Sequence, residues 1–198
     1  AFFIVAALIA REGALLLENV GMNPTRAAVV EILRAMGGDI EILHAREAGG
    51  EPVADLRVRP SQLHGIAIDE ALVPIVIDEF PVLFIAAACA EGETRATALH
   101  ELRVKESDRL ATMEAGLRAL GVDCVAGADT MTIRGKAGTA FTGGTVESHG
   151  DHRIAMSFAT AALRAAAPIV VRDCANVATS FPSFQTLAQG VGMVVGDA

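Results

Sequence analysis

The sequence predicts an α/β fold of copied units with apolar helices inside and sheets outside, the inside-out form of an α/β barrel. One order of elements recurs three times: an apolar helix, a strand, an amphipathic helix and another strand. A spacing of roughly seventy residues is too long for a solenoid and indicates one domain of repeated units. The apolar helices are expected at 1–10, 81–90 and 153–163. Because they are apolar on nearly every face, each should be buried on all sides.

The elements between these helices follow from periodicity. Apolar residues at helical spacing predict surface helices at 25–36, 107–120 and 184–189, each followed by a glycine. Asn23 and Pro24 suit the start of the first of them. A turn into the last is expected at 178–184. Strands are expected at 14–20, 39–43, 55–59, 65–68, 94–99, 122–125, 130–134, 144–147, 168–172 and 191–195.

The composition limits the class of protein. With 198 residues, 52% of them hydrophobic and 20% charged, the chain can bury a sizeable core. A net charge of −8 argues against a nucleic-acid binder that relies on bulk charge. If the ligand is an anion, its site must therefore be a local reversal of the overall field.

Cysteine usage and hydropathy exclude further classes. Cys89, Cys124 and Cys174 are best explained as buried small hydrophobic residues in a reducing compartment, rather than as disulfide or metal ligands. Charged residues interrupt the long apolar runs, so no membrane span is expected. Ala1 stands inside the first helical pattern, so we expect the chain to be a fragment of a longer protein.

The densest run of charge lies at 101–109, directly before an apolar helical pattern. It should form a loop and the first turn of a helix, with Ser107 as the N-cap. Lys105 and Arg109 add positive charge where a helix N-terminus already favours anions. Glu106 is held between them, a setting that can tune a carboxylate for proton transfer. The alternative is a solvated helix start with ordinary ion pairs.

Similar charged sites precede the other two apolar helices. Asp78 lies just before the helix at 81–90, and Asp151 is a good N-cap for the helix that contains Arg153. His152 has no partner at metal-ligand spacing, so no metal site is expected there. If the buried helices are parallel, their N-termini meet at one edge and form an anion-collecting surface. Three independent helix caps remain the alternative. The residues of the predicted site are Asp78, Lys105, Glu106, Arg109 and Arg153.

Four segments of the chain resemble one known family. They are 77–81 (IDEFP), 103–109 (RVKESDR), 151–153 (DHR) and 179–182 (TSFP). This sequence resembles the 5-enolpyruvylshikimate-3-phosphate synthase family, the target of glyphosate, over essentially its whole length. The resemblance covers only the C-terminal half of such an enzyme. It implies three βαβαββ-type units with parallel helices inside, and a missing N-terminal domain that completes the active site.

The resemblance also implies a reaction and roles for residues. Phosphoenolpyruvate and shikimate 3-phosphate give an enolpyruvyl ether and phosphate, without metal or organic cofactor. Asp78 holds and deprotonates the attacking hydroxyl, and Glu106 exchanges a proton with C3 of phosphoenolpyruvate. Lys105 contacts shikimate 3-phosphate or assists proton transfer, while Arg109 and Arg153 clamp phosphoenolpyruvate. The parent would be a monomeric bacterial cytoplasmic enzyme, with no nucleic-acid or membrane partner.

Two positions depart from the family pattern. Thr179 stands where some members carry a lysine that contacts phosphoenolpyruvate, and Glu101 stands where others have an asparagine that touches shikimate phosphate. Two other functions stay open: an enolpyruvyl transferase that acts on UDP-N-acetylglucosamine, and a non-catalytic anion-binding domain. We expect the fragment alone to be nearly inactive, because the family closes two domains over its substrates.

Overall fold

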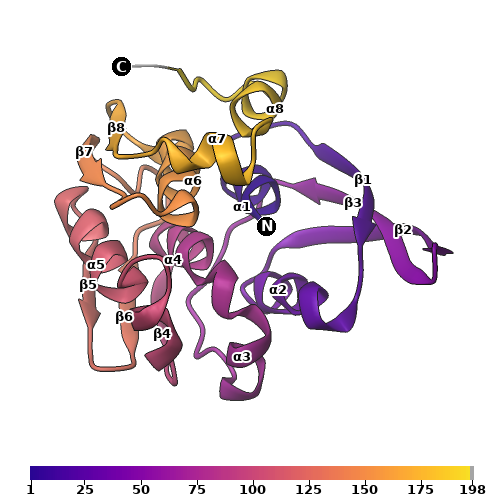
Figure 1. The fold of residues 1–198 in the computed structure, drawn as a ribbon, viewed down its shortest axis with the longest axis horizontal. Helices are drawn as coiled ribbons and strands as arrows, with labels where there is room; N and C mark the ends of the chain where they lie inside the picture. The colour runs from indigo at the N-terminus through magenta and orange to yellow at the C-terminus, as the bar shows by residue number, and fades with distance from the viewer. Residues whose placement is uncertain (197–198) are drawn as a thin grey trace.

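Three apolar helices pack against one another at the centre of the molecule (Figure 1). They are α1 (Phe2–Ile9), α4 (Phe80–Cys89) and α6 (His152–Ala161). The structure, a computed structural model, describes residues 1–196, except for the side chains of residues 24–26. All 10 residues of α4 are buried, as expected for a helix without a polar face.

Two antiparallel sheets of three strands lie beside these helices (Figure 1). The first, ordered β1-β3-β2, contains β1 (Leu15–Gly21), β2 (Asp39–Ala48) and β3 (Glu51–Arg59). The second, ordered β4-β6-β5, contains β4 (Gly92–Ala96), β5 (Asp123–Ala126) and β6 (Met131–Gly135). Each middle strand directs buried side chains inward, such as Leu56 and Ile133.

Two predicted strands are shorter than expected. The strand predicted at 65–68 is reduced to isolated parallel bridges, His64 with Glu91 and Ala67 with Arg95. The strand predicted at 94–99 ends at Ala96. Ala98 has a φ of 57°, a left-handed conformation that cannot continue an extended strand.

The third sheet has two parallel strands, β7 (Gly144–Glu147) and β8 (Ile169–Arg172). The strand predicted at 191–195 is wrong, because these residues form a turn and then irregular chain. A strand needs hydrogen bonds from a neighbouring strand, whereas the Met193 N–H donates back to Ala188 O at the end of the preceding helix. Val194 is consequently 99% exposed.

The outer helices complete the fold. The predicted surface helices are found as α2 (Pro24–Ala35), α5 (Arg109–Ala119) and α8 (Phe184–Gly190). The predicted turn at 178–184 is partly helical, because α7 (Asn176–Ser180) forms there. Shorter helical pieces are η1 (Glu70–Leu72), α3 (Val73–Val76), η2 (Ile77–Glu79), η3 (His100–Val104) and η4 (Ala162–Arg164).

The cysteines are free thiols in two environments. Cys89 on α4 and Cys124 on β5 are buried, as predicted, and burial raises their thiol pKa values to about 12 and about 11. Cys174 is exposed, so the prediction that it is buried is wrong. It follows β8 in a loop that leaves the core.

One segment is long and apolar enough to cross a membrane by length and composition alone, contrary to the prediction. It runs from Glu70 to Cys89 through four short helical pieces. Its most apolar window is 72% buried inside the protein, and a buried core helix passes the same test. The segment is therefore only a weak indication of a membrane span.

Candidate active site

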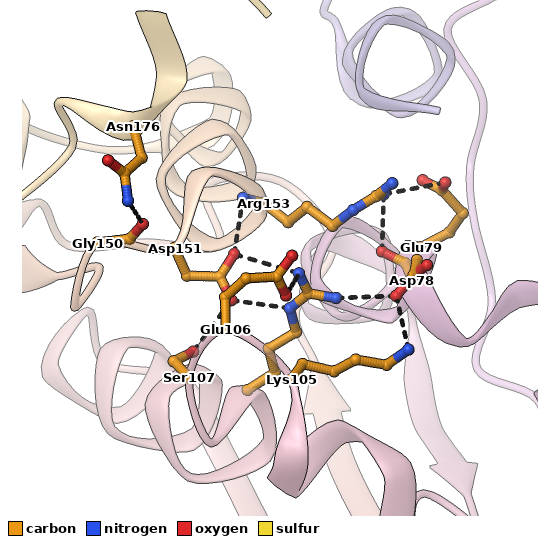
Figure 2. Close-up of polar contacts among 10 residues, drawn as sticks. Asp78, Glu79, Lys105, Glu106, Ser107, Gly150, Asp151, Arg153 and Asn176 are labelled. Atoms are coloured by element: carbon orange, nitrogen blue, oxygen red, sulfur yellow. Dashed lines mark hydrogen bonds and ion pairs between the residues drawn. The ribbon is translucent and has the colours of Figure 1, made fainter. Parts of the chain in front are cut away.

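Three segments that precede helices converge at one place (Figure 2). Asp78 and Glu79 end η2 just before α4, and Lys105 and Glu106 lie in the loop before α5. Asp151 is the N-cap of α6. Because α4, α5 and α6 pack against one another, their starting residues are held within reach.

Arg109 is the centre of this cluster. Its side chain is 1% exposed, and its guanidinium contacts three carboxylates at once. Nη1 lies 3.0 Å from Asp78 Oδ1, Nη2 lies 2.5 Å from Glu106 Oε2, and Nε lies 2.8 Å from Asp151 Oδ2. A buried guanidinium is costly unless its donors are matched in this way.

Asp78 and Lys105 form the outer part of the cluster. Lys105 Nζ lies 3.2 Å from Asp78 Oδ1, and the Asp78 side chain is 48% exposed. Partial burial of Asp78 disfavours its charged form. The hydrogen bond from Lys105 and the charge of Arg153 outweigh this effect, so the pKa of Asp78 lies below its ordinary value. Asp78 is therefore ionised at neutral pH.

Arg153 joins the cluster from α6. Its Nη1 donates to the Asp78 backbone oxygen at 2.9 Å and to Glu79 Oε1 at 3.0 Å (Figure 2). The side chain reaches from the start of one buried helix to the start of another. The two apolar helices α4 and α6 are thus linked by a charged contact at their N-terminal ends.

Asp151 is fully buried and accepts hydrogen bonds on both oxygens. Oδ1 accepts from the Arg153 N–H at 2.9 Å, which confirms the predicted N-cap. Oδ2 accepts from Arg109 and from Ser107 Oγ, the latter at 3.1 Å. Burial opposes ionisation of Asp151. The hydrogen bond and charge of Arg109 outweigh it and hold the carboxyl pKa below its usual range.

The N-cap of α5 was predicted wrongly as Ser107. The cap is Asp108, whose Oδ1 accepts from the Ala111 N–H at 2.9 Å. Ser107 turns its hydroxyl toward Asp151 instead. Arg103 donates to Asp108 Oδ2 at 2.8 Å and to the backbone oxygen of Ala128 at 2.6 Å. Arg103 and Asp108 therefore have a structural role, which agrees with the alternative interpretation of the charged run as a helix start with ordinary ion pairs.

The structure brings all five predicted site residues into one connected set of contacts. Glu101 on η3 and Thr179 on α7 are exposed and are not among the contacts described above. Sequence reasoning missed Glu79, Ser107 and Asp151 as members of the site. Glu79 and Ser107 directly follow the predicted site residues Asp78 and Glu106, and this adjacency could have indicated them from the sequence.

A cavity of about 520 Å³ opens beside the cluster. Asp78, Glu79 and Arg153 line it together with apolar side chains such as Ile4 and Ile75. A pocket of about 580 Å³ between α6, β8, α7 and α8 has no charged side chain in its lining. Among the described residues, no group of three or more His, Cys, Asp or Glu could hold a metal ion.

The fold is that of the enolpyruvyl transferases. The enolpyruvyl transferase NikO from Streptomyces tendae superposes with a TM-score of 0.72 over 97% of this chain and 41% of its own, at 17% identity. An EPSP synthase structure from Acinetobacter baumannii superposes with a TM-score of 0.95 at 50% identity, over 98% of this chain and 45% of its own.

The chain belongs to the EPSP synthase (3-phosphoshikimate 1-carboxyvinyltransferase) family, whose sequence model matches residues 1–187. The 3-phosphoshikimate 1-carboxyvinyltransferase of Alkalilimnicola ehrlichii is 60% identical over 100% of this chain. That of Methylococcus capsulatus is 60% identical over 98% of it. The chain spans 44% of the length of each of these relatives.

Proposed function

We propose that the chain supplies half of the active site of an enzyme that transfers the enolpyruvyl group of phosphoenolpyruvate to the 5-hydroxyl of shikimate 3-phosphate. Phosphate is released. One observation carries the proposal: a buried arginine, Arg109, meets two half-exposed carboxylates, Asp78 and Glu106, beside a cavity. Cations for an anionic substrate and carboxylates for proton transfer are thus in contact.

The cations divide between the two substrates. Arg109 and Arg153 bind phosphoenolpyruvate, because a guanidinium grips a carboxylate or phosphate with two parallel hydrogen bonds. Lys105 and Asp78 bind shikimate 3-phosphate, as a point charge and a hydroxyl acceptor. In the substrate-free cluster, Arg109 is paired with carboxylates of the protein, so an incoming anion must replace one of them.

Glu106 is the partner that an anion replaces. Its side chain is 52% exposed and it contacts Arg109 through one nitrogen, whereas Asp151 is buried. Once displaced, the Glu106 carboxylate takes up a proton from solvent and gives it to C3 of phosphoenolpyruvate. The 5-hydroxyl oxygen then bonds to C2, and Asp78 accepts the hydroxyl proton. When phosphate leaves the tetrahedral ketal, Glu106 takes a proton back from C3.

Asp78 suits the acceptor role by position more than by basicity. Its lowered pKa keeps it ionised, so it accepts the hydroxyl hydrogen bond and orients the oxygen toward C2. Lys105 Nζ, 3.2 Å from Asp78 Oδ1, stabilises the charge and assists the proton transfer.

The proposal extends to the parent enzyme. The chain forms one domain of three βαβαββ-type repeats, an inside-out barrel with parallel buried helices, and an N-terminal domain closes over it. The parent is a monomeric cytoplasmic bacterial enzyme that needs no metal or organic cofactor and is the target class of glyphosate. The three buried helices support the inside-out barrel, and the 44% coverage of relatives supports the second domain.

The test is an assay of the full-length parent. Phosphoenolpyruvate and shikimate 3-phosphate should give the enolpyruvyl ether and one equivalent of phosphate, identified by mass and by phosphate release. UDP-N-acetylglucosamine in place of shikimate 3-phosphate should give no product. Turnover of UDP-N-acetylglucosamine alone would favour the related transferase, and absence of turnover with either acceptor would favour an anion-binding domain.

A further inference from the structure

We propose that Asp151 is a positioning residue that orients the guanidinium of the substrate-binding Arg109 and holds it against the start of α6, the helix that bears Arg153. The inference rests on the proposed function and adds a residue to it. Asp151 touches neither the cavity nor any predicted reacting group. Its effect on the reaction would pass through the arginines.

The contacts of Asp151 divide between two helices. Oδ1 accepts from the Arg153 N–H at 2.9 Å, at the start of α6, and from Arg109 Nη2 at 3.5 Å. Oδ2 accepts from Arg109 Nε at 2.8 Å and from Ser107 Oγ at 3.1 Å, both at the start of α5. One carboxylate therefore joins the two segments that bear Arg109 and Arg153.

Burial makes this contact strong. Asp151 is 0% exposed and the Arg109 side chain is 1% exposed, so water cannot replace either partner. A lone charge left at this depth would be costly, and each group therefore holds the other. Ser107 supplies a further donor to the carboxylate.

The contact also orients the guanidinium of Arg109. Nε and, at 3.5 Å, Nη2 donate to Asp151 inside the protein, while Nη1 and Nη2 also face the half-exposed carboxylates Asp78 and Glu106. These are the nitrogens that an incoming anion would use. Without the Asp151 charge, the guanidinium could turn and pair more completely with Asp78 and Glu106. Its nitrogens would then be less available to an incoming anion.

The test is Asp151→Asn in the full-length enzyme. Asparagine is an equally good N-cap, so its oxygen keeps the bond to the Arg153 N–H. Its NH₂ group would face Arg109 Nε, donor against donor. We expect the KM for phosphoenolpyruvate to rise about tenfold or more, because a charge-assisted hydrogen bond is lost. The Kd for shikimate 3-phosphate should change less than about twofold, since Lys105 is untouched.

The matched control is Asp108→Asn. Asp108 is also an N-cap aspartate in this region, but it caps α5 and pairs with Arg103 rather than Arg109. Its KM for phosphoenolpyruvate should stay within about twofold of the unmodified enzyme. Equal rises in KM for both variants would mean that loss of a carboxylate charge at a helix N-terminus, not orientation of Arg109, is responsible, and would overturn the proposal.

A second measurement does not depend on turnover. The Arg109 Nε–H should give a slowly exchanging ¹⁵N NMR signal, assigned with Arg109→Lys, and Asp151→Asn should make that exchange fast. An unchanged signal and unchanged KM would overturn the positioning role. An unmodified enzyme without turnover, but with the protected signal, would contradict the proposed function instead. If Asp151→Asn does not fold, Ser107→Ala decides: the proposal requires faster exchange at Arg109, and unchanged exchange would overturn it.

Discussion

Glu106 and Arg109 are paired in the absence of substrate, and this pairing has a measurable consequence. Glu106→Gln in the full-length enzyme should lower kcat by about 10²- to 10⁴-fold, because glutamine cannot exchange a proton with C3. The KM for phosphoenolpyruvate should not rise, because the competing charge at Arg109 Nη2 is removed. Steady-state kinetics measures both values.

The control for this variant is Glu101→Gln. Glu101 is an exposed glutamate on η3, five positions earlier in the same charged run. Its kcat should be unchanged. If Glu106→Gln turned over at the unmodified rate, the catalytic role of Glu106 would be wrong, and a non-catalytic anion site would be the better explanation.

The residue types of the site could be predicted, but their pairing could not. A lysine, arginines and carboxylates before apolar helices indicate an anion site from sequence alone. That Asp151 contacts Arg109 across 42 positions depends on how α5 packs against α6. The choice between Ser107 and Asp108 as N-cap depended on the same packing, because Ser107 is drawn toward Asp151.

At the scale of elements, β3 is held to both of its neighbours by Asp55. The pairing register shifts at a bulge in β1 and at another in β2, both beside Asp55. Its carboxylate accepts from the Asn19 N–H at 2.9 Å, lies 2.8 Å from His44 Nδ1, and accepts from Arg46 at 3.1 Å. These contacts, the Asn19 hydrogen bond foremost, lower the Asp55 pKa to about 2.

This lowered pKa gives the first sheet a defined dependence on pH. The pKa of an unfolded aspartate is about 3.9, so the stabilisation is complete above that pH and disappears as the pH falls toward 2. Asp55→Asn should therefore have a lower melting temperature than the unmodified protein at pH 7, with the difference closing near pH 2. Asp39→Asn, which alters an exposed pair with Arg59, should show little difference. A gap that stayed constant with pH would contradict this.

The packing of α5 on α6 depends on Gly116. A Cβ at this position would lie 2.3 Å from Phe158 Cζ, and Phe158 is fully buried. Gly116→Ala should destabilise the protein by about 1–3 kcal/mol through overpacking. The higher helix propensity of alanine should offset about 1 kcal/mol of this cost. The matched control is Gly190→Ala on α8, where a Cβ meets nothing within 4 Å. Urea unfolding measures both, and equal stabilities would contradict the packing argument.

Elements with strong periodicity could be predicted from the sequence, and those that depend on a neighbour could not. The apolar helices needed only their own residues, so α1, α4 and α6 lie close to the expected bounds. The segment 191–195 has β-branched residues but finds no strand to pair with among the described residues. A strand forms only next to another strand, and the pattern within one segment does not reveal whether such a neighbour is present.

For the whole molecule, charge and length lead to one further expectation. The net charge is −8, and the cations of the site are paired with Asp78, Glu79, Glu106 and Asp151. An anionic substrate must therefore break ion pairs to bind. The chain spans 44% of its relatives, so a second domain is expected to provide the remaining substrate contacts and to exclude water.

We therefore expect residues 1–198 alone to show less than about 1% of the kcat of the full-length enzyme, since in the proposed mechanism closure of a second domain completes the site. Adding the separately expressed remainder of the parent should restore part of the activity in proportion to its concentration. Phosphate release measures the rate, and circular dichroism shows whether the fragment is folded. The full-length Glu106→Gln variant serves as the control for background phosphate release. Turnover by the folded fragment near the full-length rate would show that these helix N-termini form a complete site without a second domain.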